Sequence, residues 1–186
     1  MIRRFRPGDA QGTWDVFFAA VRIGAAGHYT EQELIDWAPV DQMPADWGDW
    51  LHRHITYVAE PDSTVGSSDT PVTGFFMLER NGYLNMAFVA PEHRRNGLAG
   101  QLYAAILADA KALRLPRLTV IASRLATPFF RRAGWVDDPD PPSSAYERKS
   151  ILEPSNSAEG RASYQAPVVG IYGCRANALQ IGRAHV

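Results

Sequence analysis

The 186-residue sequence has little of several features that mark particular classes of protein. It contains one cysteine, Cys174, so an internal disulfide is impossible, and such low cysteine usage is typical of a reducing cytoplasm. Its formal net charge is -1, which gives no overall attraction for nucleic acid or for an anionic membrane. No apolar run reaches the roughly 18 residues of a membrane-spanning helix. We therefore expect a cytoplasmic protein whose partners include neither nucleic acid nor a membrane.

Hydrophobic spacing and turn residues predict an alternation of short strands and helices. Strands are predicted over residues 2–6, 55–60, 72–79, 83–89, 118–122, 135–136 and 145–152. Helices are predicted over residues 9–25, 30–39, 46–54, 97–113 and 126–133. Asn81-Gly82 predicts a tight hairpin between two of the strands. This order favours an α/β (α+β) fold with a mixed, mostly antiparallel sheet and helices on its faces.

The composition changes beyond about residue 153. The stretch EPSNSAEGRAS resembles a linker. The final residues IGRAHV can be encoded by bases that match a common sequencing adapter, in which a stop codon follows. We expect residues 1–152 to form the domain and residues 153–186 to be a disordered or artefactual tail. A natural tail that matches the adapter by chance is the alternative.

The stretch RRNGLAG, residues 94–100, follows a strand that Pro91 ends, and it opens a helix. Gly97 and Ala99 would let a ligand approach the backbone closely. The first N–H groups of a helix have no internal partners, and the helix dipole is positive at that end. With two arginines beside it, this turn favours an anion site suited to phosphate. The alternative is an ordinary strand-to-helix turn with surface arginines.

Two segments resemble motifs of the GNAT superfamily of N-acetyltransferases. RRNGLA is similar to its pyrophosphate-binding motif, (Gln/Arg)-x-x-Gly-x-(Gly/Ala), whose fixed positions are filled by Arg94, Gly97 and Ala99. Residues 122–135 resemble a second pattern, Asn-x-x-Ala-x-x-Phe-Tyr-x-x-x-Gly-Phe. It is matched at Ala126, Phe129 and Gly134, and changed at Ser123, Phe130 and Trp135.

The resemblance extends over roughly residues 2–152. The neighbouring HYTEQELIDWAP resembles a small-molecule or stress-related branch of the family. The resemblance implies a GNAT fold in which the strand bearing Val89 splays from the strand bearing Val120. The pantetheine arm of acetyl-CoA, the implied co-substrate, would lie between the two strands. The implied cofactor-binding residues are Phe88 and Val89 for pantetheine, Arg94, Arg95, Asn96, Gly97, Leu98, Ala99 and Gly100 for pyrophosphate, and Ser123, Phe130 and Arg132 near the thiol and adenosine ends.

The family's chemistry implies a small set of catalytic groups. The backbone N–H of Val89 would stabilise the developing thioester oxyanion. Many relatives carry a tyrosine acid at the position of Phe130, and a subset has phenylalanine there, so Ser123 is a candidate to assist the thiolate here. Asn85 can hold a water but cannot act as a base.

The general base stays open among His28, Tyr29, Glu31, Glu33, Asp36, His52 and His54. His28, Tyr29 and Trp37 are expected to contact the acceptor. Trp37, Trp47 and Trp50 are most simply core and cleft wall, and an aromatic acceptor pocket is the sharper interpretation.

The leading hypothesis is an acetyl-CoA-dependent N-acetyltransferase that moves an acetyl group directly to the primary amine of a small molecule. Phe130 motivates an alternative, a non-catalytic module that binds or senses acyl-CoA on the same fold. A protein N-acetyltransferase is a third option. We expect no metal cofactor, and the oligomeric state stays open, with a homodimer as one option.

Overall fold

A computed structural model of the chain describes residues 1–39, 42–61, 71–137 and 172–176. The strands are β1 (Ile2–Arg4), β2 (Ile55–Ala59), β3 (Gly74–Leu78), β4 (Tyr83–Val89), β5 (Leu118–Ala122), β6 (Val136–Asp137) and β7 (Tyr172–Ala176). The helices are α1 (Ala10–Arg22), α2 (Glu31–Trp37), α3 (Trp47–Arg53), α4 (Leu98–Ala112) and α5 (Thr127–Arg132), with short 3-10 turns η1 (Pro7–Asp9) and η2 (Pro91–His93).

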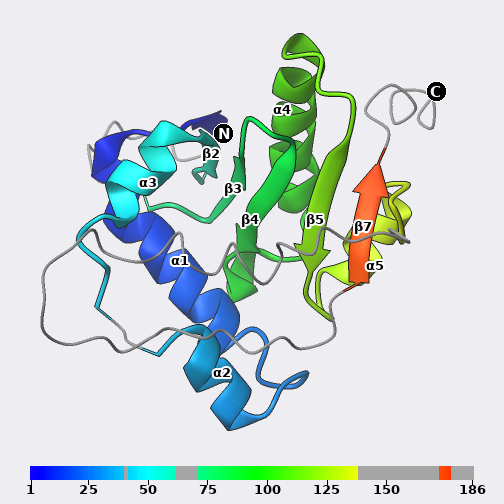
Figure 1. The fold of residues 1–186 in the computed structure, drawn as a ribbon. Coiled ribbons are helices and arrows are strands. Elements are labelled where there is room, and N and C mark those ends of the chain that lie inside the picture. The colour runs from blue at the N-terminus through cyan, green and yellow to red at the C-terminus, as the bar shows by residue number, and fades with distance from the viewer. Residues whose placement is uncertain (40–41, 62–70, 138–171, 177–186) are drawn as a thin grey trace, which may run out of the picture.

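The strands form one sheet in the order β1-β2-β3-β4-β5-β7-β6 (Figure 1). Every neighbouring pair is antiparallel except β4 and β5, which run parallel. The expectation of a mixed, mostly antiparallel sheet is therefore confirmed. Among the described residues, no helix is both long and apolar enough to cross a membrane.

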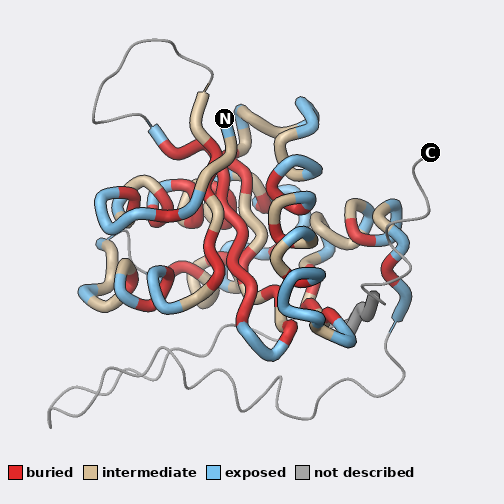
Figure 2. The backbone as a smooth tube through the Cα atoms, turned by 90° about the horizontal axis from the view of Figure 1, so that it is seen from above, coloured by how far each residue is buried: buried red, intermediate tan, exposed pale blue. Residues whose placement is uncertain are grey.

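Helices cover both faces of the sheet (Figure 1). Helices α1, α2 and α3 pack on one face, which we call the α1 face, and α4 and α5 pack on the other, the α4 face. Each strand sends alternate side chains to the two faces, because successive Cβ atoms of a strand point in opposite directions. Figure 2 shows the buried residues concentrated along the central strands and on the helix sides that face them.

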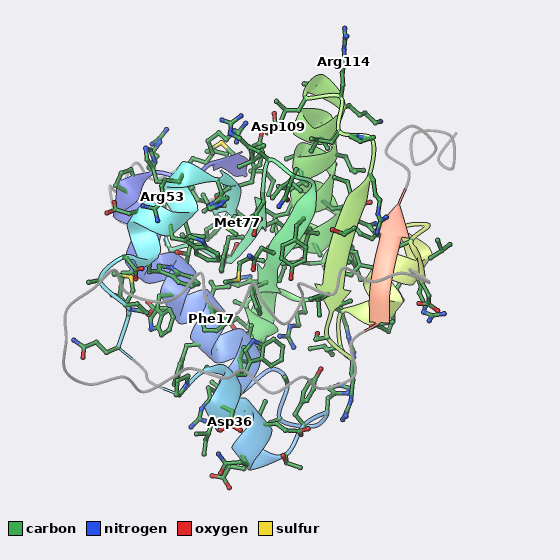
Figure 3. The ribbon with its side chains drawn as sticks, viewed as in Figure 1. Phe17, Asp36, Arg53, Met77, Asp109 and Arg114 are labelled. Carbon is green, nitrogen blue, oxygen red and sulfur yellow. The ribbon has the colours of Figure 1, made fainter. Side chains whose placement is uncertain are left out.

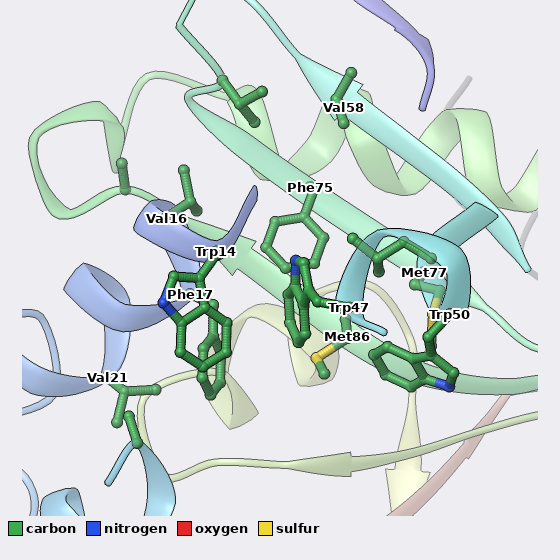
Figure 4. Close-up of a cluster of buried hydrophobic side chains, with 14 of the residues drawn as sticks. Trp14, Val16, Phe17, Val21, Trp47, Trp50, Val58, Phe75, Met77 and Met86 are labelled. Carbon is green, nitrogen blue, oxygen red and sulfur yellow. The ribbon is translucent and has the colours of Figure 1, made fainter. Parts of the chain in front are cut away.

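Aromatic rings dominate the core on the α1 face (Figure 4). Trp47, which is 1% exposed, lies 5.1 Å from Trp14 and 5.6 Å from Phe17 between ring centroids. Its indole Nε1–H donates to the hydroxyl of Thr13 at 3.0 Å. Trp50 is buried in the same cluster. The interpretation of these two tryptophans as core residues is confirmed.

The predicted hairpin at Asn81-Gly82 is confirmed. Gly82 has a φ of 90°, and a Cβ there would collide with the carbonyl oxygen of Arg117. The side chain of Asn81 accepts a hydrogen bond from the Tyr83 N–H at 2.9 Å. Glycine is needed for both the left-handed backbone and the close approach.

The C-terminal part of the sheet differs from the prediction. Strand β7 pairs with β5 from Leu118↔Ala176 to Ala122↔Tyr172, and β6 pairs with its other side. These five residues belong to the range expected to be a tail, so the sheet extends past residue 152. The short segment YGCRA carries no alternating pattern, and backbone pairing alone needs none. The strand predicted over 145–152 lies outside the described residues.

Tyr103 of α4 supplies a testable core interaction on the α4 face. The indole Nε1–H of Trp135 donates to its hydroxyl oxygen at 2.6 Å, and burial raises the pKa of Tyr103 to about 12. Tyr103→Phe would leave the buried indole donor without its acceptor, at a cost of about 1–3 kcal/mol. We expect denaturant unfolding at pH 7 to show this loss.

The same variant should reveal a pH dependence. A raised pKa favours the neutral phenol, so its stabilisation is complete below pH 10, the ordinary tyrosine value, and is lost as the pH rises toward 12. The stability difference between the parent and Tyr103→Phe should therefore shrink above pH 10. A difference that stays constant up to pH 11 would contradict this assignment.

Candidate functional site

Strands β4 and β5 separate soon after they meet. They pair only at Tyr83↔Thr119 and Leu84↔Val120, although β4 continues to Val89 and β5 to Ala122. The two strands run in the same direction, so both of the halves that no longer pair are C-terminal halves. These halves separate and leave a gap between them. We call the Leu84–Val120 pair the vertex of this gap and its other end the open end. The splayed strand pair expected from the sequence is confirmed.

The backbone of β4 presents polar groups to this gap. The N–H of Ala90 donates to the carbonyl of Thr73 at 3.0 Å, so it points toward β3. Successive N–H groups of a strand alternate in direction. Phe88 therefore also faces β3 with its N–H, whereas Val89 and Ala87 turn theirs into the gap. Of the two residues expected to contact a ligand through the backbone, Val89 turns its N–H into the gap and Phe88 does not, whereas Ala87 does.

A β-bulge lies beside the vertex. Leu78 is opposite Leu84 and Met77 is opposite Met86, so Asn85 is an extra residue on β4. Its side-chain Nδ2 donates to Oε1 of Glu79 at 2.8 Å. The other carboxylate oxygen, Oε2, accepts from Nδ2 of Asn81 at 3.0 Å. Glu79 is only 8% exposed. It was not singled out from the sequence, although an acidic residue that ends an apolar strand was a visible signal.

The turn before α4 has the backbone shape of an anion cradle. Arg95 and Gly97 both have positive φ values, 65° and 84°. The side chain of Asn96 accepts from the Leu98 N–H at 3.2 Å and so caps the helix. The next two N–H groups, at Ala99 and Gly100, belong to the first helical turn and have no intrahelical acceptor. A Cβ at Gly97 would have no atom within 4 Å, so this face of the turn has room for a ligand.

The side chain of Arg94 has a structural role. Its guanidinium donates to the carbonyls of Gly24 at 2.8 Å, Ala20 at 3.2 Å and Val89 at 3.3 Å. Burial lowers the pKa of Arg94. A Cβ at Gly24 would lie 2.6 Å from Nη1 of Arg94, so glycine makes this contact possible. Arg94 was expected at the pyrophosphate site, and its guanidinium donors hold the C-terminal end of α1 against β4. The side chain of Arg95 is exposed.

A second arginine holds the same connection from the β5 side. The backbone N–H of Arg124 donates to the hydroxyl oxygen of Tyr29 at 2.8 Å, and its Nη1 donates to the carbonyl of His28 at 2.9 Å. Its guanidinium also lies 5.0 Å from the ring centroid of Tyr29. Residues 23–30, which we call the crossing segment, are therefore tied to both sides of the open end. The side chain of His28 is exposed, so only its carbonyl takes part.

Three aromatic rings line the α1 face near the open end. Trp37 lies 5.7 Å from Tyr29 and 6.4 Å from Phe88 between ring centroids. We call these residues the aromatic wall. Thr30 starts α2 directly after Tyr29 by the predicted capping box, in which the Glu33 N–H donates to the Thr30 hydroxyl. Figure 3 shows Asp36 of α2 at this end of the molecule and Arg114, after α4, at the opposite end.

The second motif has mainly local structural roles. The Ser123 hydroxyl oxygen accepts from the Ala126 N–H at 3.2 Å at the start of α5. Phe130 is 1% exposed and packs against Phe129, Tyr103 and Trp135. The ring of Phe130, expected near the cofactor, is therefore part of the core on the α4 face. Arg132 is exposed in the last turn of α5.

The candidate bases differ in how free they are. Backbone and side-chain hydrogen bonds from Thr30 lower the pKa of Glu33, so its carboxylate is a capping group and a weaker base. Nδ1 of His54 lies 2.8 Å from the carbonyl of Trp50, so this nitrogen carries a proton and Nε2 is the free one. Neither of these residues is at the vertex of the gap.

Comparison with known proteins decides the family. A model of the acetyltransferase (GNAT) domain matches residues 29–147. The chain belongs to the GNAT family of N-acetyltransferases. It is 33% identical over 134 residues to an uncharacterised N-acetyltransferase, YafP, of Escherichia coli K12, with 72% of this chain and 79% of that protein covered.

Solved structures of this family share the fold. A GCN5-related N-acetyltransferase from Rhodopseudomonas palustris superposes with a TM-score of 0.71 at 22% identity and covers 95% of this chain and 94% of its own. The PaiA N-acetyltransferase of Thermoplasma acidophilum, solved in complex with coenzyme A, gives 0.64 at 12% identity, over 95% and 98% of the two chains.

Substitution of the two neighbouring arginines of the first motif should have different effects on stability. Arg94→Ala removes donors to three carbonyls and should destabilise the fold by about 1–3 kcal/mol in denaturant unfolding. Arg95→Ala removes an exposed side chain and should change stability by less than about 0.5 kcal/mol. Equal losses in the two variants would argue against the structural role of Arg94.

Proposed function

We propose that this N-acetyltransferase transfers the acetyl group of acetyl-CoA directly to the primary amine of a small molecule. One arrangement carries the proposal. The gap between β4 and β5 receives backbone N–H groups along one side, meets the anion cradle at its open end, and is bordered by the aromatic wall. The N–H groups match the amide-bearing arm of the co-substrate, the cradle matches its diphosphate, and the aromatic wall matches the amine acceptor.

The described residues fit the diphosphate and the arm. The N–H groups of Ala99 and Gly100, together with the exposed Arg95, would hold the pyrophosphate beside Gly97, where there is room. The N–H and carbonyl of Val89, near the open end, suit an amide of the arm. Acetyl-CoA supplies the acetyl group as an activated thioester.

The same strand offers a donor deeper in the gap. The thioester lies farthest along the arm from the diphosphate, so it would lie nearest the vertex. The N–H of Ala87 is closer to the vertex than that of Val89. We therefore assign to the Ala87 N–H the stabilisation of the negative charge that develops on the thioester oxygen. Val89, expected in this role, is then an arm-binding residue. The Ser123 oxygen accepts from Ala126, which leaves its O–H able to donate to a leaving thiolate.

The acceptor side favours a small amine. The aromatic wall offers apolar surface for the body of the acceptor. The crossing segment passes the open end and is held there by Arg94 and Arg124, which limits the space for an extended polypeptide.

Turnover with purified protein tests this proposal. Acetyl-CoA is mixed with a panel of primary amines, including spermidine, tryptamine and glucosamine, and with lysine-bearing peptides, and free thiol is followed. Amine-dependent thiol release with an acetylated small amine supports the proposal. Release with peptides alone identifies a protein acetyltransferase, and calorimetric binding of acetyl-CoA without release in any mixture identifies the non-catalytic alternative.

A glutamate at Gly97 should block the cradle. Gly97→Glu places a negative charge beside the diphosphate, so we expect CoA affinity measured by calorimetry to fall more than about tenfold, which is about 1.4 kcal/mol. Gly134→Glu is the matched control, because Gly134 also has a φ of 84° and open space around it. Both variants should lose similar stability from the left-handed backbone, about 1–2 kcal/mol. Unchanged affinity in Gly97→Glu would contradict the position of the cradle.

A further inference from the structure

A buried carboxylate lies next to the vertex of the gap, and the proposed reaction has not yet used it. Glu79 follows β3, and its backbone N–H donates to the carbonyl of Tyr83 at 2.9 Å. Both carboxylate oxygens accept one hydrogen bond each, from Asn81 and Asn85. Each oxygen has a further lone pair, so the carboxylate can accept more donors. Its two partners are neutral amides, and the ion pairs among the described residues, such as Arg3–Glu60 and Arg4–Asp109, do not include it.

The sheet register places this carboxylate on the acceptor side. Met77 belongs to the core of the α1 face and Leu78 to the core of the α4 face, so Glu79 points to the α1 face by alternation. The ring of Phe88, part of the aromatic wall, lies on the same face. Asn85 is the first β4 residue beyond the last β4–β5 pair, and its hydrogen bond connects Glu79 to the vertex.

Few other titratable groups face Glu79. The β2–β3 register, continued by one residue from Ile55↔Leu78, places His54 opposite Glu79. Tyr83 is its partner across the hairpin. On α3, the ring of Trp50 lies 5.8 Å from that of His54, and this side chain does not titrate. The indole N–H of Trp50 is buried and has no acceptor among the described residues, so this region keeps a spare donor.

We propose that Glu79 receives the proton of the acceptor ammonium, and that the Asn85 bulge holds its carboxylate toward the vertex. This inference rests on the proposed function. The acceptor R–NH₃⁺ gives one proton to the carboxylate, directly or through one water, and becomes R–NH₂. The amine nitrogen then forms the C–N bond as the C–S bond breaks. The second proton of the nitrogen leaves with the thiolate, so free thiol, amide and one released proton balance the reaction.

The amide partners make this assignment more specific than a buried acid alone. An arginine or lysine beside Glu79 would pair with its carboxylate, as Arg3 pairs with Glu60 toward the far edge of the sheet. Amide donors fix the orientation of Glu79 without supplying a positive charge. The bulge lets Asn85 share the α1 face with Met86, whereas a regular strand would place these adjacent residues on opposite faces.

Glu79→Gln tests the proposal against a matched variant. Glutamine keeps the size of the side chain and removes its basicity. Glu60→Gln makes the same change at a carboxylate that lies away from the gap and binds Arg3. For an amine that the parent acetylates, we expect Glu79→Gln to lower kcat by roughly 10²–10⁴-fold. Its calorimetric affinity for CoA should stay within about twofold of the parent, and Glu60→Gln should lose stability but keep its kcat.

The pH profile separates a proton acceptor from a merely structural residue. The parent rate should fall at low pH as the carboxylate is protonated, and Glu79→Gln should lose this limb. A limb that survives in Glu79→Gln and disappears in His54→Gln would overturn the proposal in favour of His54. A kcat within about twofold of the parent would overturn it outright, and so would an equal loss of CoA affinity and of melting temperature.

The experiment also has a readout that does not depend on the acceptor. If no amine is acetylated, the small-amine function fails, but water can still attack acetyl-CoA in the same site and must lose a proton to do so. Slower acetate release by Glu79→Gln than by the parent and Glu60→Gln would then support the role of Glu79. Equal acetate release by the three proteins would overturn it.

Discussion

Two arginines hold the crossing segment across the open end of the β4–β5 gap, and the geometry of the site depends on them. Arg94 reaches back from the turn after β4 to carbonyls at the end of α1, and Arg124 reaches from the turn after β5 to His28 and Tyr29. Parallel strands that diverge have no mutual hydrogen bonds to fix the width of the gap. The connection between α1 and α2 supplies this constraint from outside the sheet. It also positions Tyr29 and Trp37 beside Phe88, so the aromatic wall and the gap are held by the same contacts.

Strand β4 serves three sides of the site because its groups alternate. Its N–H groups at Ala87 and Val89 turn into the gap, while those at Phe88 and Ala90 hold β3. Its side chains at Met86 and Phe88 belong to the α1 face, and that of Val89 packs on the α4 face. The bulge at Asn85 shifts this alternation by one residue just where the two strands part. A regular strand could not place both Asn85, which binds Glu79, and Met86 on the α1 face, because adjacent residues of a regular strand point to opposite faces.

The sequence predicted the parts of the site that are local in the chain. Strands β4 and β5 have the predicted bounds, and Gly97, singled out in the turn before α4, has a left-handed backbone. The role of the Arg94 side chain was not predictable, because its acceptors lie 70 and 74 residues away. The shared face of Asn85 and Met86 depends on a bulge, which one extra residue creates without a sequence signal of its own. Strand β7 was missed because its segment YGCRA carries no alternating pattern of apolar and polar residues.

The buried ring of Phe130 bears on which proton transfer limits the reaction. A thiol has an ordinary pKa of about 8.5, so a departing thiolate is nearly stable in neutral water, whereas an alkyl ammonium has an ordinary pKa of about 10.4 and gives up its proton reluctantly. Phe130 offers no proton, and the pKa of Tyr103, raised by burial to about 12, keeps that phenol protonated within the core. The reaction therefore needs an acid for the leaving thiolate less than it needs a base for the acceptor ammonium. The proton on the acceptor is the larger obstacle, and a carboxylate held by two neutral amides beside the vertex acts on that proton. Many relatives have a tyrosine acid at position 130. Its replacement by the buried Phe130 would then leave the deprotonation of the acceptor ammonium, which we propose as the slower step, unchanged.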